Sequence, residues 1–299
     1  MADPRFRGSG VALVTPFDDA GVNEAVLREL VRFQRQEGTD AIIVCGSTGE
    51  AATMSPEEQR RALEIVVDEL DGAIPVVMGC GGSDTKQVTR LARQAAEAGA
   101  DAVLVSAPPY NKPTQKGLLA HYHAVLEAQD RPLIVYNVPG RTSVNILPAT
   151  IAELARSERV IGVKEACGDI SQVAELARLL EDRALIWSGN DDQTVPIMAL
   201  GGVGIISVLA NVAPNATRRM AHLFLDGDVT GARRLQLQLL PLIAALFAES
   251  NPIPVKTGVG LLGYDVGPLR LPLTPPGEAT RQKLATAMRE AGLSLPAAT

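Results

Sequence analysis

A lysine at the end of an apolar run gives the first sign of chemistry in this sequence. Lys164 follows residues 160–163, Val-Ile-Gly-Val, a run typical of a strand that is buried on both faces. Burying an ammonium group is costly unless the group is paired or neutralised. A lysine that loses its proton in an apolar pocket becomes a nucleophile that attacks carbonyls and forms a Schiff base. The alternative is a strand-end lysine whose ammonium extends into water, and the other segments must decide between the two.

Polar groups follow other apolar runs in the same way. Residues 46–50 read Gly-Ser-Thr-Gly-Glu, residues 107–113 contain a tyrosine, residues 136–142 begin with Tyr and end in Arg-Thr, and residues 187–191 end in Asn-Asp. Each group alone has a plain explanation. Ser and Thr often cap turns, a tyrosine often packs in a core, an arginine is often an exposed loop charge, and Asn-Asp often caps the next helix. Their joint placement after successive runs favours one shared site instead.

The elements that must position these groups are apolar runs alternating with amphipathic segments up to about residue 225. Eight runs are spaced by roughly the 25–30 residues that one βα unit requires. The predicted strands are 10–17, 41–46, 75–81, 102–108, 132–139, 160–166, 184–190 and 204–211. The predicted helices are 23–37, 55–70, 84–98, 115–129, 147–157, 169–182, 191–200 and 214–225.

Eight βα units indicate an α/β fold, a (β/α)₈ TIM barrel, rather than an open sheet. In such a barrel the active-site groups lie at the carboxyl ends of the strands, where the polar groups of this sequence fall. The remaining chain reads as a helix over 229–250, a Pro-rich link, and a helix over 277–291. We therefore predict a catalytic barrel domain over residues 1–227 and a C-terminal helical domain over residues 228–299.

Composition excludes several classes of protein. Net charge is -6 and no basic stripe is visible, so nucleic-acid binding has little support. No apolar run reaches the ~18 residues of a membrane span, and residues 1–5 lack a signal-peptide core. Three distant cysteines, Cys45, Cys80 and Cys167, fit neither a disulfide framework nor a zinc site, which favours the cytoplasm. His121 and His123 lie two apart on a predicted helix, so they diverge and are not expected to share a metal.

Taken together, these stretches resemble the dihydrodipicolinate synthase / N-acetylneuraminate lyase family of class I, Schiff-base aldolases. The resemblance runs from Val-Thr-Pro-Phe at 14–17 through Asn-Pro-Ile-Pro-Val-Lys at 251–256. Its most specific parts are Gly-Ser-Thr-Gly-Glu at 46–50, Tyr-Asn-Val-Pro-Gly-Arg-Thr at 136–142 and Val-Lys-Glu-Ala at 163–166, which are specific in combination.

The resemblance implies a role for each matching catalytic residue. Lys164 would condense with the carbonyl of pyruvate to give an imine and then an enamine. Tyr136 would be the general acid/base, and because a phenol with a pKa of about 10 is a poor base at neutral pH, it needs a proton relay. Ser47 and Tyr110 would supply that relay, with Tyr110 contributed across a subunit interface.

The resemblance also implies the substrate contacts. Thr48 and the backbone of 46–49 would bind the pyruvate carboxylate, and Gly189 and Ile206 would be further substrate-binding residues. Arg141 would bind the carboxylate of the second substrate, a small aldehyde, through its bidentate fork. No cofactor and no metal are expected, because the imine itself is the electron sink.

Two branches of the family compete. Synthases condense pyruvate with aspartate-4-semialdehyde, whereas lyases cleave sialic acid to pyruvate and an N-acetylated sugar. Ser47 is more typical of the lyases, since synthases usually have Thr there, but it keeps the hydroxyl. Arg141 favours the synthase, because a compact carboxylate-bearing aldehyde needs an arginine and a polyhydroxylated sugar does not. Other 2-keto acid aldolases, and a non-catalytic keto-acid-binding barrel, stay as alternatives.

Assembly and feedback are also implied by the resemblance. Relatives are commonly homotetramers built from dimers, which the relay role of Tyr110 would require. Lysine-inhibited relatives bind lysine at an interface pocket through His, Asn and Glu side chains and a second aromatic. The matching positions here are Pro56, Ser83, Gln87 and Pro109, so lysine inhibition is expected to be weak or absent.

Overall fold

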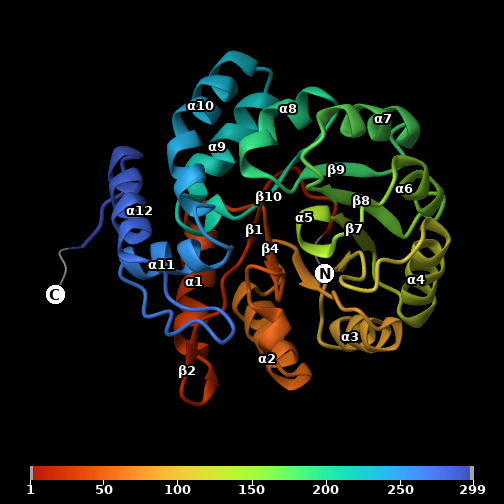
Figure 1. The fold of residues 1–299 in the computed structure, drawn as a ribbon, viewed down its shortest axis with the longest axis horizontal. Helices are drawn as coiled ribbons and strands as arrows, with labels where there is room; N and C mark the ends of the chain where they lie inside the picture. Colours follow the sequence, from red (N-terminus) through yellow and green to blue (C-terminus); the bar gives the residue numbers. More distant parts are fainter. Residues whose placement is uncertain (1–2, 297–299) are drawn as a thin grey trace.

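The computed structural model describes residues 3–296 and contains a closed barrel of eight parallel strands (Figure 1). Their order around the barrel is β1-β10-β9-β8-β7-β6-β5-β4. These strands are β1 Gly8–Ala12, β4 Ala41–Val44, β5 Val76–Gly79, β6 Ala102–Ser106, β7 Leu133–Asn137, β8 Val160–Glu165, β9 Leu185–Ser188 and β10 Gly204–Ser207. The strands β2 Phe17–Asp18 and β3 Gly21–Val22 pair separately and antiparallel. The prediction of a TIM barrel is confirmed.

Helices surround the barrel, as Figure 1 shows. The α-helices are α1 Glu24–Gln36, α2 Pro56–Leu70, α3 Thr85–Glu97, α4 Gln115–Ala128, α5 Pro139–Thr142, α6 Pro148–Leu154, α7 Ile170–Leu180, α8 Thr194–Ala199, α9 Pro214–Leu225, α10 Val229–Leu246, α11 Ile253–Leu261 and α12 Glu278–Glu290. The 3-10 helices are η1 Ala51–Thr53, η2 Asp191–Gln193 and η3 Leu209–Asn211. Helix α2 begins with a capping box, in which Ser55 and Glu58 satisfy each other's backbone amides.

Every barrel strand ends before its predicted carboxyl end. The first strand, for example, ends at Ala12 rather than at Phe17. Beyond it the amide of Val14 donates to the side chain of Asn211, and Phe17 pairs with Val22 in the small second sheet. Residues 13, 14 and 17 are nevertheless fully buried, because the loops above the barrel pack under the surrounding helices. Buried apolar residues therefore continue beyond the last hydrogen-bonded pair of the strands, so an apolar run does not mark where a strand ends.

The C-terminal part is helical, but the predicted Pro-rich link is wrong over part of its length. Residues 253–261 form α11, directly after Pro252. Pro252 occupies the N-cap and Pro254 the first turn, where a missing backbone donor costs no helical hydrogen bond. Helices α10, α11 and α12 gather on one side of the barrel (Figure 1). The division into domains at residue 228 stays a prediction, and its outer ends, 1–2 and 297–299, lie outside the described residues.

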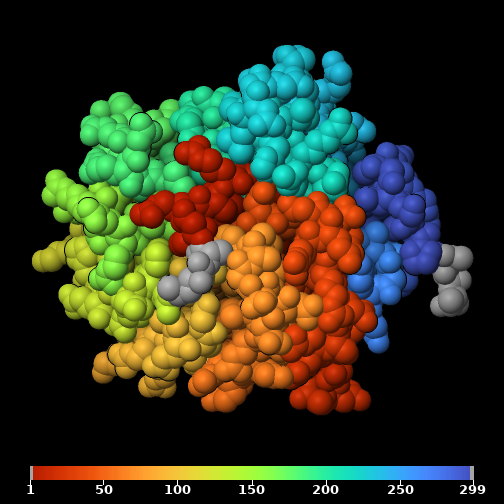
Figure 2. All heavy atoms as spheres, turned by 180° about the vertical axis from the view of Figure 1, so that it is seen from behind, coloured from red at the N-terminus to blue at the C-terminus, as the bar shows by residue number. Residues whose placement is uncertain are grey.

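The amino end of the barrel is closed by the segment that precedes β1. The Phe6 ring stacks on Trp187 of β9 at a centroid distance of 5.0 Å, and the Trp187 indole donates to the Phe6 carbonyl at 3.2 Å. Figure 2 shows the first described residues lying across the middle of that face. With this end closed, a small molecule enters from the carboxyl end. No helix within residues 3–296 is both long and apolar enough to cross a membrane.

Candidate active site

A cavity of about 630 Å³ opens at the carboxyl ends of the strands. Most of the predicted site residues line it, although they come from four different strand ends and the segments that follow them. They are Ser47, Thr48, Tyr136, Arg141, Lys164 and Gly189. The fold thus brings together residues that lie more than 140 positions apart in the sequence, as the joint placement after successive apolar runs predicted.

Lys164 and Tyr136 form the centre of this cavity. They are register partners on the neighbouring strands β8 and β7, and the Lys164 Nζ lies 4.4 Å from the centroid of the Tyr136 ring. Only 5% of the Lys164 surface is exposed. Burial lowers the Lys164 pKa from 10.5 to about 7, with Asp191 opposing and the Arg141 guanidinium adding to the shift. Much of the amine is therefore neutral and nucleophilic at physiological pH.

The pKa of Tyr136 is shifted upward, whereas that of Lys164 is shifted downward. Burial raises the pKa of its phenol to about 12; the positive charge of Arg141 opposes this shift, and the negative charge of Glu165 adds to it. The phenol consequently carries its proton at neutral pH and can donate it to an oxygen atom beside the Lys164 amine. A neutral amine next to a protonated phenol is the pair that carbinolamine dehydration to an imine requires.

Asp191 belongs to the polar group at 187–191 that the sequence places at the rim, but the sequence assigns it no role of its own. It lies at the start of η2, but its carboxylate is buried and bonded to β10 and the loop after it. Ser207 Oγ donates to Oδ1, and the amides of Val208 and Leu209 donate to Oδ2 at 3.0 and 3.2 Å. Burial raises the Asp191 pKa, and the hydrogen bonds from Ser207, Leu209 and Val208 together with the Lys164 ammonium oppose this shift. In its anionic form Asp191 favours the charged form of the Lys164 amine.

The turn at 46–49 has the features of a carboxylate site. Thr15 Oγ1 donates to the Gly49 carbonyl at 2.7 Å, and the Asn251 amide donates to Thr48 Oγ1 at 2.9 Å. Within the described part of the chain, the backbone amides of Ser47 and Thr48 have no hydrogen-bond partner. Unpaired amides beside a cavity are suited to bind an anion such as a carboxylate.

Arg141 stands at the rim of the cavity on the short helix α5. Its Nη2 donates to the Asn251 carbonyl at 2.8 Å, which fixes one side of the guanidinium and leaves the other donors available. Asn251 thus contacts both Thr48 and Arg141, although it lies about 110 residues beyond Arg141 in the sequence. The sequence placed Asn251 only within a family motif and assigned it no role.

Gly189 lies where a larger residue cannot fit. A Cβ at this position would approach Ala166 Cβ to 2.7 Å and two carbons of Lys164 to 3.1 Å. The contact with Ala166 is closer than packed atoms accept, and Lys164 would have to shift by a few tenths of an ångström. Glycine therefore keeps the space beside Lys164 and Ala166 open, and a direct substrate contact stays a prediction.

Two predicted site residues do not lie in this cavity. Tyr110 is 89% exposed, with a left-handed φ of 69°, and Ile206 is fully buried in the barrel interior. Ile206 does not line the cavity because its side chain packs in the core of the barrel. Tyr110 projects away from its own chain's cavity, so it can join a relay only if another subunit receives it. Among residues 3–296, no group of three His, Cys, Asp or Glu side chains is arranged to hold a metal.

Comparison with known proteins agrees with this geometry. The model of the dihydrodipicolinate synthetase family matches residues 5–291. The chain belongs to the dihydrodipicolinate synthetase family. It is 51% identical to the 4-hydroxy-tetrahydrodipicolinate synthase of Thermoanaerobacter sp. (strain X514), over 97% of this chain and 98% of that relative.

Solved structures show the same likeness along the whole chain. Dihydrodipicolinate synthase from Thermotoga maritima superposes with a TM-score of 0.95 at 41% identity, covering 97% of this chain and 100% of that chain. The chloride-inhibited dihydrodipicolinate synthase from Acinetobacter baumannii, complexed with pyruvate, gives a TM-score of 0.94 at 39% identity, covering 96% of this chain and 99% of that chain. The family resemblance read from the motifs is confirmed.

The lowered pKa of Lys164 predicts the pH dependence of imine formation. Since only the neutral amine attacks, the initial rate with subsaturating pyruvate should rise with pH and reach half its plateau near pH 7. Trapping the imine with cyanoborohydride and weighing the Lys164 peptide at each pH measures this rate. The peptide of the exposed Lys283 is the internal control and should stay unlabelled. A midpoint near the ordinary lysine pKa of about 10.4 would contradict the account.

Proposed function

We propose that the chain condenses pyruvate with aspartate-4-semialdehyde to form 4-hydroxy-tetrahydrodipicolinate, a step of lysine and diaminopimelate biosynthesis. The observation that carries the proposal is the pairing of a lysine of lowered pKa with a protonated tyrosine in one cavity. The names of the relatives, and the pyruvate complex of the Acinetobacter baumannii enzyme, support the same reaction.

The first half-reaction joins pyruvate to the protein. The neutral Lys164 amine attacks the C2 carbonyl of pyruvate, while the Tyr136 phenol gives a proton to the developing alkoxide. Loss of water from the carbinolamine leaves the imine. The phenolate form of Tyr136 then takes a proton from C3 of the protonated imine, and the electrons of the broken C–H bond form the enamine. The amides of Ser47 and Thr48 and the Thr48 hydroxyl would hold the pyruvate carboxylate during these steps.

The second half-reaction forms the new carbon–carbon bond. The enamine carbon attacks the aldehyde carbon of the semialdehyde, and Tyr136 protonates the resulting alkoxide. Arg141 would hold the carboxylate of the aldehyde at the rim. The amino group of the semialdehyde then attacks the imine carbon, which closes the ring and releases Lys164 as a free amine.

Tyr136 must regain its proton after each turnover, and a single chain supplies only part of the proposed proton relay. Ser47 lies in the cavity and provides one hydroxyl of the proposed relay. Tyr110 of the partner subunit would provide the next, which fits its exposed position and left-handed backbone. Because Tyr110 would have to come from another subunit, we propose an oligomer, and by the family resemblance a homotetramer built as a dimer of dimers. We also propose that the protein works in the cytoplasm, which the three distant cysteines favour.

The competing functions are separated by a substrate comparison. Turnover should be seen with pyruvate and aspartate-4-semialdehyde and not with sialic acid, because Arg141 would bind a carboxylate close to the reacting carbon. Preferred cleavage of sialic acid would favour a neuraminate lyase. Pyruvate trapping without turnover of any aldehyde would favour a keto-acid-binding barrel.

Lysine should inhibit the reaction weakly or not at all. Ser83, Gln87 and Pro109 line the outer part of the cavity, and Pro56 begins α2. None of the four offers the carboxylate or imidazole that would bind the amino groups of a lysine ligand. Steady-state rates at rising lysine concentration, up to the millimolar range, measure the effect. A micromolar inhibition constant would overturn this prediction.

A further inference from the structure

A buried ion pair joins the turn at 46–49 to the C-terminal extension. Glu50 follows the turn, and its Oε1 accepts from the Nζ of Lys256 of α11 at 2.7 Å. Their side chains are only 1% and 2% exposed, respectively. The mechanism above uses neither residue, although each is a charge that is costly to remove from water.

Two hydrogen-bond acceptors and an aromatic ring surround the Lys256 ammonium. Beyond Glu50, it donates to the Pro268 carbonyl at 2.8 Å and lies 4.3 Å above the centroid of the Phe17 ring. Burial lowers the Lys256 pKa, and the hydrogen bond and charge of Glu50 oppose that shift. Removing either partner would therefore leave the other as an unpaired group in the interior.

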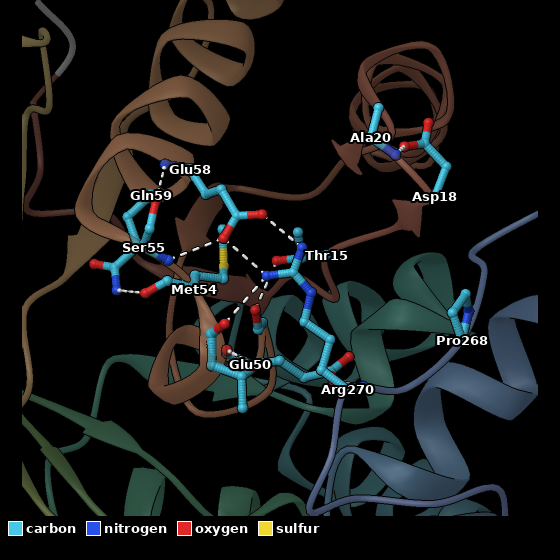
Figure 3. Close-up of polar contacts among 12 residues, drawn as sticks. Thr15, Asp18, Ala20, Glu50, Met54, Ser55, Glu58, Gln59, Pro268 and Arg270 are labelled. Carbon is cyan, nitrogen blue, oxygen red and sulfur yellow. Dashed lines mark hydrogen bonds and ion pairs between the residues drawn. The ribbon is translucent and has the colours of Figure 1, made fainter.

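Arg270 extends the same cluster to helix α2. Its backbone amide donates to Glu50 Oε2 at 2.9 Å, and its guanidinium lies 3.9 Å from the Phe17 ring. Its Nη1 donates at 2.8 Å to Glu58, the residue of the capping box of α2. Figure 3 shows Arg270 lying between Glu50 and Glu58. Both oxygens of Glu50 are thus held by residues of the C-terminal part, one by Lys256 and one by Arg270.

The backbone on both sides of the turn explains why such anchoring is needed. Cys45 and Glu50 have φ values of 54° and 56°, a left-handed conformation that non-glycine residues adopt at a cost. Such residues persist only where surrounding contacts fix them. Replacing a buried ion pair by apolar groups is often neutral or stabilising, so stability alone does not account for this pair.

We infer that Glu50 and Lys256 are positioning residues, whose ion pair holds residues 46–49 in the conformation that binds the pyruvate carboxylate. The inference rests on the proposed function and extends it: the C-terminal helices set the affinity for pyruvate without contacting it. Neither residue takes part in proton transfer or bond formation.

The kinetic test uses Glu50→Gln and Lys256→Met in the full-length protein. We expect the KM for pyruvate to rise about tenfold in each, because the turn binds the carboxylate equally in the ground state and the transition state. The kcat at saturating pyruvate and the KM for the semialdehyde should change less than about twofold. Pyruvate KM values within about twofold of wild type in both variants would overturn the inference.

A double variant separates positioning from stability. Glu50→Gln/Lys256→Met leaves no unpaired buried charge, so its melting temperature should return to near that of the wild type. Its KM for pyruvate should stay raised, because the ionic anchor of the turn is still missing. If KM recovers together with the melting temperature, the pair is merely structural and the inference fails. Should Lys256→Met fail to fold, Glu50→Gln and the double variant give the same decision.

A matched control and a prior check complete the design. Glu24 and Arg61 form an exposed ion pair between α1 and α2 at 2.6 Å, so Glu24→Gln should leave the KM for pyruvate unchanged. The wild-type protein must first trap pyruvate at Lys164 with borohydride. Failure of that trap refutes the proposed function, whereas normal trapping with unchanged pyruvate dependence in the variants refutes only the positioning role.

Discussion

Replacing Lys164 with methionine should abolish turnover, lowering kcat at least roughly 10⁴-fold, the scale of losing a covalent nucleophile. Methionine has a similar length and no amine, so it fills the space beside Tyr136 without offering an attacking group. The fold should survive, since a buried apolar side chain suits the site better than a buried ammonium. Initial rates with saturating pyruvate and semialdehyde measure the loss. A variant that keeps even about one hundredth of the wild-type rate would contradict a Schiff-base mechanism through Lys164.

The same substitution has an expected effect on stability, with a definite sign. The Lys164 pKa is lowered to about 7 in the folded protein, from 10.5. Between these values the unfolded chain binds the extra proton, so the wild-type free energy of unfolding contains a term that rises with pH. Below pH 7 the folded protein carries the full penalty of a buried charge. Lys164→Met should therefore be more stable than wild type at about pH 6, with the advantage shrinking toward about pH 10, as thermal unfolding would show.

Arg141→Ala has the second largest expected effect, and it should fall on the second substrate. Removing the charge that binds the aldehyde carboxylate should lower kcat/KM for aspartate-4-semialdehyde by roughly 10²–10³-fold, the usual result of truncating one partner of a close charge pair. Imine formation with pyruvate should change far less. Arg141→Lys keeps the charge and loses the planar fork. Its kcat/KM for aspartate-4-semialdehyde should lie between those of the wild type and Arg141→Ala.

The measurement must allow for the influence of Arg141 on Lys164. Its positive charge helps to lower the Lys164 pKa, so Arg141→Ala should shift the pH profile of imine formation upward. Comparing imine yields at about pH 9, where the amine is largely neutral in both proteins, removes this effect. If imine formation and semialdehyde use fall equally at that pH, the assigned role of Arg141 is wrong.

The sequence predicted the centre of the site because its signals are local. An ammonium that ends a run of apolar residues is conspicuous, and parallel strands in a barrel place their carboxyl ends on one rim. This reasoning predicts that Lys164, Tyr136 and the turn at 46–49 share one site. It also predicted the cap of α2, since Ser-Pro-Glu-Glu at 55–58 satisfies the helix start by itself.

What escaped prediction depends on contacts between distant segments. Asn251 contacts Thr48 and Arg141 from more than 100 residues away, and nothing in its own neighbourhood indicates this. Helix α11 was missed because its prolines resemble a link, although they occupy the first turn, where proline is tolerated. The sequence placed Asp191 at the rim but assigned it no role, because the contacts of its carboxylate with the carboxyl end of β10 are visible only in three dimensions.

The central claim is that Lys164 forms the covalent bond with pyruvate, and one measurement tests it directly. The protein is incubated with pyruvate, reduced with borohydride, digested and weighed by mass spectrometry. We predict the mass of one reduced pyruvate adduct on the intact protein, located on the peptide that contains Lys164 and absent from the Lys164→Met variant. An unmodified Lys164 peptide, or an adduct found on another lysine, would contradict the account.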